Sequence, residues 1–209
     1  MAETLTLYTN PMSRGRTARW MLEEVGVPYD VQVLEMGSSM KAPEYLAINP
    51  MGKVPAIKHV DRVVTEVAAI CAYLADAFPD AGLAPPVGAR ADYYRWMFFA
   101  AGPLEAAMTN RSMGFELKAE QRQGSGYGSY ETAVQTMADA VAKRRFIAGD
   151  TFSTADVCVG SLLEYALNFK LVEPQAAFTD YVARVTDRAA HKAANDKDNA
   201  LIAAAQSGS

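Results

Sequence analysis

The chain has 209 residues, half of them hydrophobic, and 20 basic side chains against 24 acidic ones give a net charge of −4. Such a length fits one large or two modest globular domains, and the apolar fraction is unlike that of a disordered chain. No dense basic stretch indicates nucleic acid as a partner, and no apolar run reaches the roughly 18–20 residues that a membrane helix needs.

The first 35 residues indicate a strand, a helix and a second strand. The opening "MAETLTLYTN" has neither the basic nor the apolar region of a signal peptide, which favours a cytoplasmic protein. Apolar residues alternate over Thr4–Thr9 and again over Tyr29–Glu35, the period of strands. The segment between them has helical spacing and ends on Gly26, a good helix stop. This order predicts a parallel pair of strands.

The next segment predicts a hairpin and a helix. Strands over Val54–Lys58 and Arg62–Thr65 are separated by three residues, which only an antiparallel hairpin can accommodate. Pro55 has no N–H to give to a sheet, so it belongs at the start or edge of its strand. A helical pattern follows and stops before Pro79. Residues 1–80 are therefore predicted to form a thioredoxin-like βαβ-ββα domain with a mixed four-stranded sheet.

Residues 81–88 are rich in proline and glycine and predict a linker, after which residues 89–209 are predicted to be all helical. Ser153 and Asp156 form a capping box before a helix that is apolar nearly all round, so this helix should lie at the domain core. The fold class is α/β followed by all-α. The expected helices cover Ala89–Arg111, Ala119–Lys143, Thr154–Phe169, Gln175–Thr186 and the alanine-rich end of the chain.

The two cysteines, Cys71 and Cys158, lie far apart in apolar helical surroundings. This placement predicts buried structural thiols rather than a disulfide framework or a metal site.

Three segments, "NPMGKVPAI", "TEVAAICAYLAD" and "GDTFSTADV", occur in this order along the chain. Together they resemble the glutathione S-transferase family, in particular cytosolic members from bacteria, over essentially the whole chain. The resemblance implies an enzyme that binds glutathione, stabilises its thiolate and conjugates it to a hydrophobic electrophile in detoxification. It also implies a homodimer, and no cofactor beyond glutathione as co-substrate.

The resemblance assigns most of the glutathione site to two backbone segments. The family proline that matches Pro55 is cis, and the backbone of Val54 before it would pair with the cysteinyl part of glutathione, as in β-augmentation. The γ-glutamyl carboxylate would meet the helix N-terminus at Glu66 and Val67, and Glu66 would take the ammonium group. Most members have Ser or Thr at Val67, and valine lacks that hydroxyl, so weakened binding is expected.

Two lysines, Lys41 and Lys53, are candidates for the glycyl carboxylate, with plain solvated side chains as the alternative. The electrophile would lie against the helical domain, in an apolar pocket with one basic group. The alternative for the residues that would line this pocket is that they belong to the domain core. The candidates are Tyr94, Phe98, Met108, Arg111, Met113, Tyr165 and Phe169.

The group that activates the thiol should follow the first strand, in "YTNPMSRGR". Ser13 is the first candidate, with a plain N-cap as its alternative, since counting back from Gly26 leaves the family serine between Met12 and Ser13. Tyr8 is the second candidate, with packing as its alternative, and Arg14 the third. The segment has no cysteine, which disfavours chemistry that needs an enzyme thiol. Alternative functions are a glutathione-dependent isomerase, peroxidase or dehalogenase, or a non-catalytic binding or stress protein.

Overall fold

The computed structural model describes residues 4–207. It contains two compact units, one formed by Met1–Leu83 with Arg188–Ser209 and the other by Ala84–Asp187. The boundary after Leu83 lies within the predicted linker at 81–88.

The first unit is a four-stranded mixed sheet with helices, which confirms the predicted thioredoxin-like architecture. The strand order is β2-β1-β3-β4. β1 is parallel to β2, and β3 is antiparallel to both β1 and β4. The elements are β1 (Leu5–Thr9), α1 (Gly15–Val25), β2 (Asp30–Val33), α2 (Pro43–Leu46), β3 (Ala56–His59), β4 (Arg62–Thr65), α3 (Val67–Ala77) and, from the end of the chain, α9 (Ala189–Ser207).

The register of the sheet brings four strand ends to one edge. Tyr8 lies opposite Ala56, and Ala56 lies opposite Thr65. Thr9 lies opposite Val33. The carboxyl ends of β1, β2 and β4 and the amino end of β3 therefore meet, and the loops that follow or precede them are neighbours.

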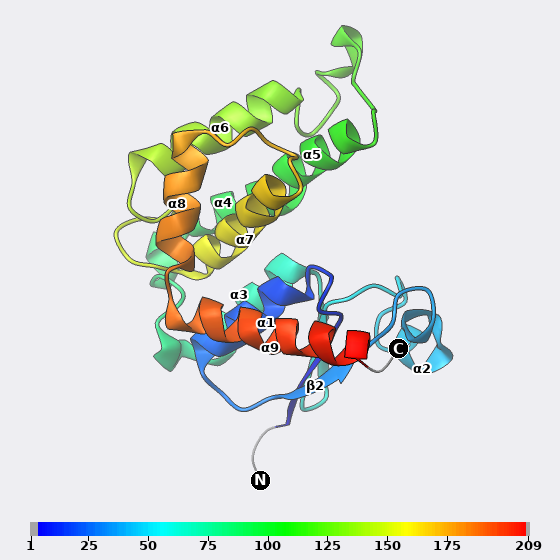
Figure 1. The fold of residues 1–209 in the computed structure, drawn as a ribbon. Coiled ribbons are helices and arrows are strands. Elements are labelled where there is room, and N and C mark those ends of the chain that lie inside the picture. The colour runs from blue at the N-terminus through cyan, green and yellow to red at the C-terminus, as the bar shows by residue number, and fades with distance from the viewer. Residues whose placement is uncertain (1–3, 208–209) are drawn as a thin grey trace. The chain divides into compact units, whose positions relative to one another are not determined.

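The last helix packs on the first one, which corrects the predicted assignment of all of residues 89–209 to the helical domain. Figure 1 shows α9 running alongside α1, and the two helices are in contact. Arg19 forms a buried ion pair with Asp198 at 2.8 Å, and Arg188 binds Glu24 at 2.6 Å. These pairs join positions more than 160 residues apart, so the periodicity of α9 alone could not locate it.

The second unit is all helical, as predicted, but two of its helices are shorter than expected. A π-helical turn at Ala100–Leu104, which contains Pro103, interrupts the helix expected over Ala89–Arg111. The helix expected from Ala119 begins only at Tyr130, after a glycine-rich loop. The helices are α4 (Ala91–Phe99), α5 (Glu105–Ser112), α6 (Tyr130–Lys143), α7 (Thr154–Asn168) and α8 (Ala176–Thr186).

The helix α7 is the buried centre of this unit, which confirms the prediction from its sequence. The Asp156 carboxylate accepts hydrogen bonds from the N–H of Ile147 at 2.8 Å, the N–H of Ser153 at 3.0 Å and the hydroxyl of Tyr181 at 2.8 Å. One side chain thus caps α7 and ties it to α8 and to the preceding loop.

Both Cys71 and Cys158 are buried thiols, as predicted. Within residues 4–207, no helix has the length and apolarity to cross a membrane. The same part of the chain contains no cluster of three side chains suited to holding a metal ion.

Candidate functional site

The predicted glutathione-site residues of the first unit gather at the sheet edge described above. Ser13 lies in the loop after β1, and Val54 and Pro55 directly precede β3. Glu66 and Val67 join β4 to α3. Because Ala56 pairs with Thr65, the segment that precedes β3 and the junction that follows β4 lie at the same end of these two strands. Residues from three separate segments thus face one edge.

The loop after β1 is fastened to β2. The Nδ2 of Asn10 donates to the carbonyl of Leu34 at 2.8 Å, and its Oδ1 accepts from the N–H of Met12 at 2.9 Å. The Met12 side chain itself is 74% exposed. Of the two residues between which the family serine is ambiguous, only Ser13 has a hydroxyl, and it is half-buried.

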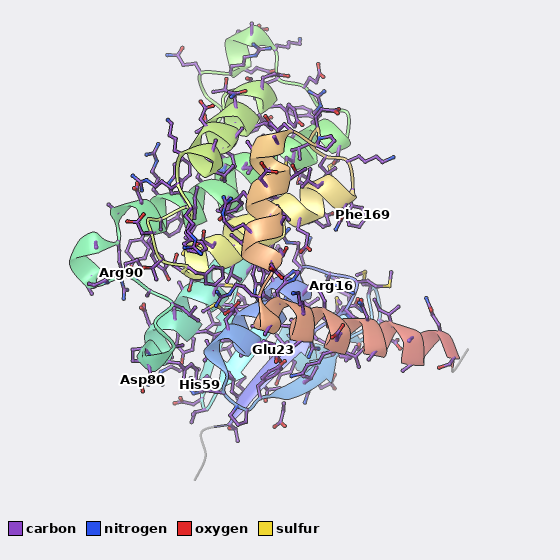
Figure 2. All side chains as sticks on the ribbon, turned by 60° about the vertical axis from the view of Figure 1, so that its left-hand side comes forward. Arg16, Glu23, His59, Asp80, Arg90 and Phe169 are labelled. Carbon is purple, nitrogen blue, oxygen red and sulfur yellow. The ribbon has the colours of Figure 1, made fainter. Side chains whose placement is uncertain are left out.

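Arg16 links the loop after β1 to α9, a contact that the sequence did not reveal. Figure 2 labels Arg16 at the beginning of α1, next to α9. Its Nε donates to the carbonyl of Pro11 at 2.7 Å, and its two terminal nitrogens donate to Asn195 at 3.0 Å and Asn199 at 2.7 Å. Only the packing of α9 on α1 brings these groups together.

The Ser13 side chain makes local hydrogen bonds just before α1, whose N-cap is Arg14. Its Oγ donates to the carbonyl of Asn10 at 2.7 Å and accepts from the N–H of Gly15 at 2.9 Å. Gly15 packs so closely on β1 that a Cβ there would lie 2.0 Å from the Oγ1 of Thr9. The hydroxyl therefore lies at the start of α1, where a helix N-terminus favours an anion, while its proton is directed to Asn10.

Tyr8 belongs to an apolar cluster at the same end of the sheet. It is 8% exposed and packs with Met40, Tyr45 and Ala56, and its ring centroid lies 5.7 Å from that of Tyr45. This placement supports the packing alternative for Tyr8. The third candidate, Arg14, directly precedes α1 and is half-buried.

The Val54 backbone is an open hydrogen-bonding edge. The Val54–Pro55 peptide bond is cis. Within residues 4–207, neither the N–H nor the C=O of Val54 has a hydrogen-bond partner, although Ala56, two residues on, is paired on both sides. A donor and an acceptor on one residue are what an extended peptide needs in order to pair with a sheet edge.

The segment before Val54 is braced by side chains. The Tyr45 hydroxyl donates to the carbonyl of Lys53 at 2.6 Å, and the Nδ2 of Asn49 donates to the same oxygen at 2.8 Å. The Nζ of Lys41 donates to the carbonyl of Met51 at 3.0 Å. Lys41 thus contacts the loop that carries Lys53, and both lysines are exposed.

The junction of β4 and α3 has a strained backbone. Glu66 has φ +67°, in the left-handed region that residues other than glycine rarely occupy. Such outliers cluster at functional sites. The turn leaves the first N–H groups of α3, starting at Val67, directed out of the helix without intrahelical partners. An exposed carboxylate and a row of backbone donors therefore lie side by side.

The predicted electrophile residues all lie in the second unit, and their environments differ. Arg111 lies 4.1 Å above the ring of Tyr130 and 3.4 Å from Glu131. Met108 is 2% exposed and packs in the core of the unit. The others are exposed aromatic or methionine side chains, and Figure 2 labels Phe169 just after α7, with its ring 4.6 Å from that of Tyr165. The exposed members are Tyr94, Phe98, Met113, Tyr165 and Phe169.

Comparisons with known proteins agree with this geometry. The family model for the glutathione S-transferase N-terminal domain matches residues 12–77. A glutathione S-transferase of Xanthomonas campestris, GST-4.5, is 30% identical over 171 residues, covering 78% of this chain and 82% of that protein. GstA of Escherichia coli O157:H7 is 31% identical over 147 residues, covering 67% and 72%.

Solved structures of glutathione transferases are also similar to this chain in fold and in sequence. A glutathione S-transferase from Xylella fastidiosa has a TM-score of 0.77 and 26% identity, covering 93% of this chain and 98% of the other. A glutathione transferase homologue from Sulfitobacter, determined with bound glutathione, has a TM-score of 0.74 and 26% identity over the same shares. The sheet topology, the capped α7 and these relatives agree, and the chain belongs to the glutathione S-transferase family of enzymes.

Proposed function

We propose that the protein binds glutathione at the sheet edge formed by Val54, Glu66 and Val67 and transfers its thiolate to a hydrophobic electrophile. The observation that carries the proposal is the open backbone of Val54, which directly precedes β3 at the end of the sheet where β4 runs into α3. The cysteinyl N–H and C=O of glutathione would pair with Val54. The γ-glutamyl carboxylate would bind the α3 N–H groups, and its ammonium group would bind Glu66.

The enzyme would have to lower the pKa of the glutathione thiol so that the thiol ionises at neutral pH. A free thiol has a pKa of about 8.5, and lowering it by about two units takes about 2.7 kcal/mol. A charge-assisted hydrogen bond of about 1.5–3 kcal/mol, together with about 0.3–1 kcal/mol from the α1 N-terminus, can supply this. Ser13 is the proposed donor; its Oγ would turn its proton from the Asn10 carbonyl to the sulfur while still accepting from Gly15. The proposal requires no cofactor beyond glutathione.

The remaining assignments follow the family. Lys41 and Lys53 would interact with the glycyl carboxylate. Exposed aromatic side chains of the second unit, with Arg111, would contact an apolar electrophile that carries a polar or anionic group. We also propose a cytoplasmic homodimer that acts in detoxification, and the molar mass in solution tests the dimer.

A direct binding test separates this proposal from a non-catalytic role. The purified protein should be retained on immobilised glutathione and eluted by free glutathione. Adding glutathione at pH 7 should also produce ultraviolet thiolate absorbance beyond that of glutathione alone, because the bound thiol has a lowered pKa. Binding without thiolate absorbance would indicate a glutathione-binding protein without this chemistry, and failure of both would reject the proposal.

The missing hydroxyl at Val67 can be restored. Val67→Ser adds a donor beside the proposed γ-glutamyl carboxylate, and the half-buried position leaves partial competition from water. A gain of about 1 kcal/mol, or roughly fivefold tighter glutathione binding, is expected. Titration calorimetry measures it, with Val67→Ala as the control that changes size without adding a hydroxyl. Equal affinity of the serine and alanine variants would show that no hydrogen bond forms there.

A further inference from the structure

The carbonyl of Lys53 has two fixed donors. The Tyr45 hydroxyl and the Nδ2 of Asn49 reach the same oxygen at 2.6 and 2.8 Å. The Lys53–Val54 peptide bond is trans and planar, so its C=O and N–H point in opposite directions. Holding the Lys53 oxygen toward Tyr45 and Asn49 therefore turns the Val54 N–H away from them, and this is the N–H that has no partner within residues 4–207.

Both donors are themselves immobilised. Tyr45 is 3% exposed, and burial raises its pKa to about 12, so it stays protonated and able to donate at physiological pH. Asn49 is 4% exposed; its own N–H donates to the Tyr45 carbonyl at 2.8 Å, and its Oδ1 accepts from the N–H of Met51 at 3.1 Å. The orientation of the Asn49 amide is thereby determined, because Nδ2 alone is left for Lys53.

We infer that Tyr45 and Asn49 are positioning residues for glutathione: they set the plane of the Lys53–Val54 peptide and so aim the Val54 N–H at the cysteinyl carbonyl. This inference rests on the proposed function. Neither side chain contacts the tripeptide, and both act through one backbone oxygen. Binding to a pre-aimed donor avoids the entropy of ordering a mobile peptide.

The test uses S-methylglutathione, which has no thiol. Its affinity therefore measures the hydrogen bonding of the tripeptide to the Val54 backbone and does not depend on the ionisation of sulfur. Tyr45→Phe removes one donor and keeps the ring, and Asn49→Asp removes the other and keeps the acceptor for Met51. Each is expected to weaken binding about threefold. The double variant should lose roughly thirtyfold, more than the product of the two, because either donor alone still restrains the shared peptide.

A positioning role predicts a specific kinetic pattern. The KM for glutathione should rise in step with the loss of affinity, while kcat at saturating glutathione and the KM for the electrophile stay near the wild-type values. Tyr73→Phe is the matched control: it removes a tyrosine hydroxyl of the same unit, one that contacts His59 at 2.8 Å, and should leave S-methylglutathione affinity unchanged. With S-methylglutathione bound, amide hydrogen exchange at Val54 should be less protected in the Tyr45 and Asn49 variants than in the wild type and the Tyr73 variant.

The outcomes are distinguishable. If the wild-type protein does not bind S-methylglutathione or glutathione, the proposed function fails. If the wild type binds and the folded double variant binds equally well, the inference is wrong. If the double variant loses kcat and electrophile affinity together with glutathione affinity, the two residues have a general structural role, and the inference is also wrong. Tyr45→Phe decides the question alone if Asn49→Asp does not fold.

Discussion

Replacing Ser13 with alanine is expected to lower kcat/KM for glutathione conjugation roughly ten- to hundredfold, the equivalent of one charge-assisted hydrogen bond to the thiolate. The apparent pKa of the bound thiol should rise at the same time. Because the Ser13 hydroxyl also accepts from the N–H of Gly15, the variant should lose about 1 kcal/mol of stability as well. The pH dependence of kcat/KM and of the thiolate absorbance measures the first effect, and urea unfolding the second.

Ser13→Asp separates the two roles. Aspartate is a good N-cap and can still accept from Gly15, but when ionised it cannot donate to a thiolate. The variant should therefore keep the wild-type stability and lose at least as much activity as Ser13→Ala. If the alanine variant keeps the wild-type thiol pKa, Ser13 is only a cap. If Tyr8→Phe then raises that pKa, the tyrosine is the activator despite its packing in the apolar cluster.

Local pattern was sufficient for the elements of the sheet unit. The alternation of Thr4–Thr9 and the stop at Gly26 both depend on neighbouring residues only, and the structure has β1 over Leu5–Thr9 and α1 ending at Val25. Gly26 adopts φ +75°, and its N–H bonds to the carbonyl of Leu22, the geometry that makes glycine a helix stop. Predictions of this kind succeed because the interactions that decide them span four residues or fewer.

Where competing local signals met, the sequence prediction was less accurate. The sequence predicted one helix from Ala119 to Lys143. Three glycines, at 124, 126 and 128, lie within that range, and Gly128 has φ +66°. Each glycine disfavours helix by about 1 kcal/mol relative to alanine, so the helix begins after them, where Ser129 caps it. Weighting the glycines above the periodicity would have located this boundary.

The supports of the site were not predictable from local pattern. Nothing in the spacing of Tyr45, Asn49 and Lys53 reveals that two donors meet at one carbonyl. The contacts of Arg16 with Asn195 and Asn199 need α9 to lie on α1, which the buried pair of Arg19 and Asp198 helps to hold. Such contacts follow from tertiary packing, and a single sequence shows the residues without their pairing.

Asp156→Ala is expected to lower the free energy of unfolding of the helical unit by about 3–5 kcal/mol, the largest effect on stability predicted for this protein. The carboxylate is fully buried and serves the N–H groups of Ile147 and Ser153 and the hydroxyl of Tyr181. Alanine would leave all of these donors buried without an acceptor. Tyr181→Phe removes a single donor and should cost only about 1 kcal/mol.

The two tryptophans allow the effect to be assigned to one unit. Trp20 lies in α1 of the sheet unit and Trp96 in α4 of the helical unit, so in a Trp20→Phe background the fluorescence reports the helical unit. Urea unfolding of Asp156→Ala in that background should shift strongly, whereas Asp180→Ala, an exposed aspartate of α8, should stay within about 0.5 kcal/mol of the parent. A loss below about 1 kcal/mol for Asp156→Ala would mean that water replaces the carboxylate, and that the capping box does not hold the core of this unit together.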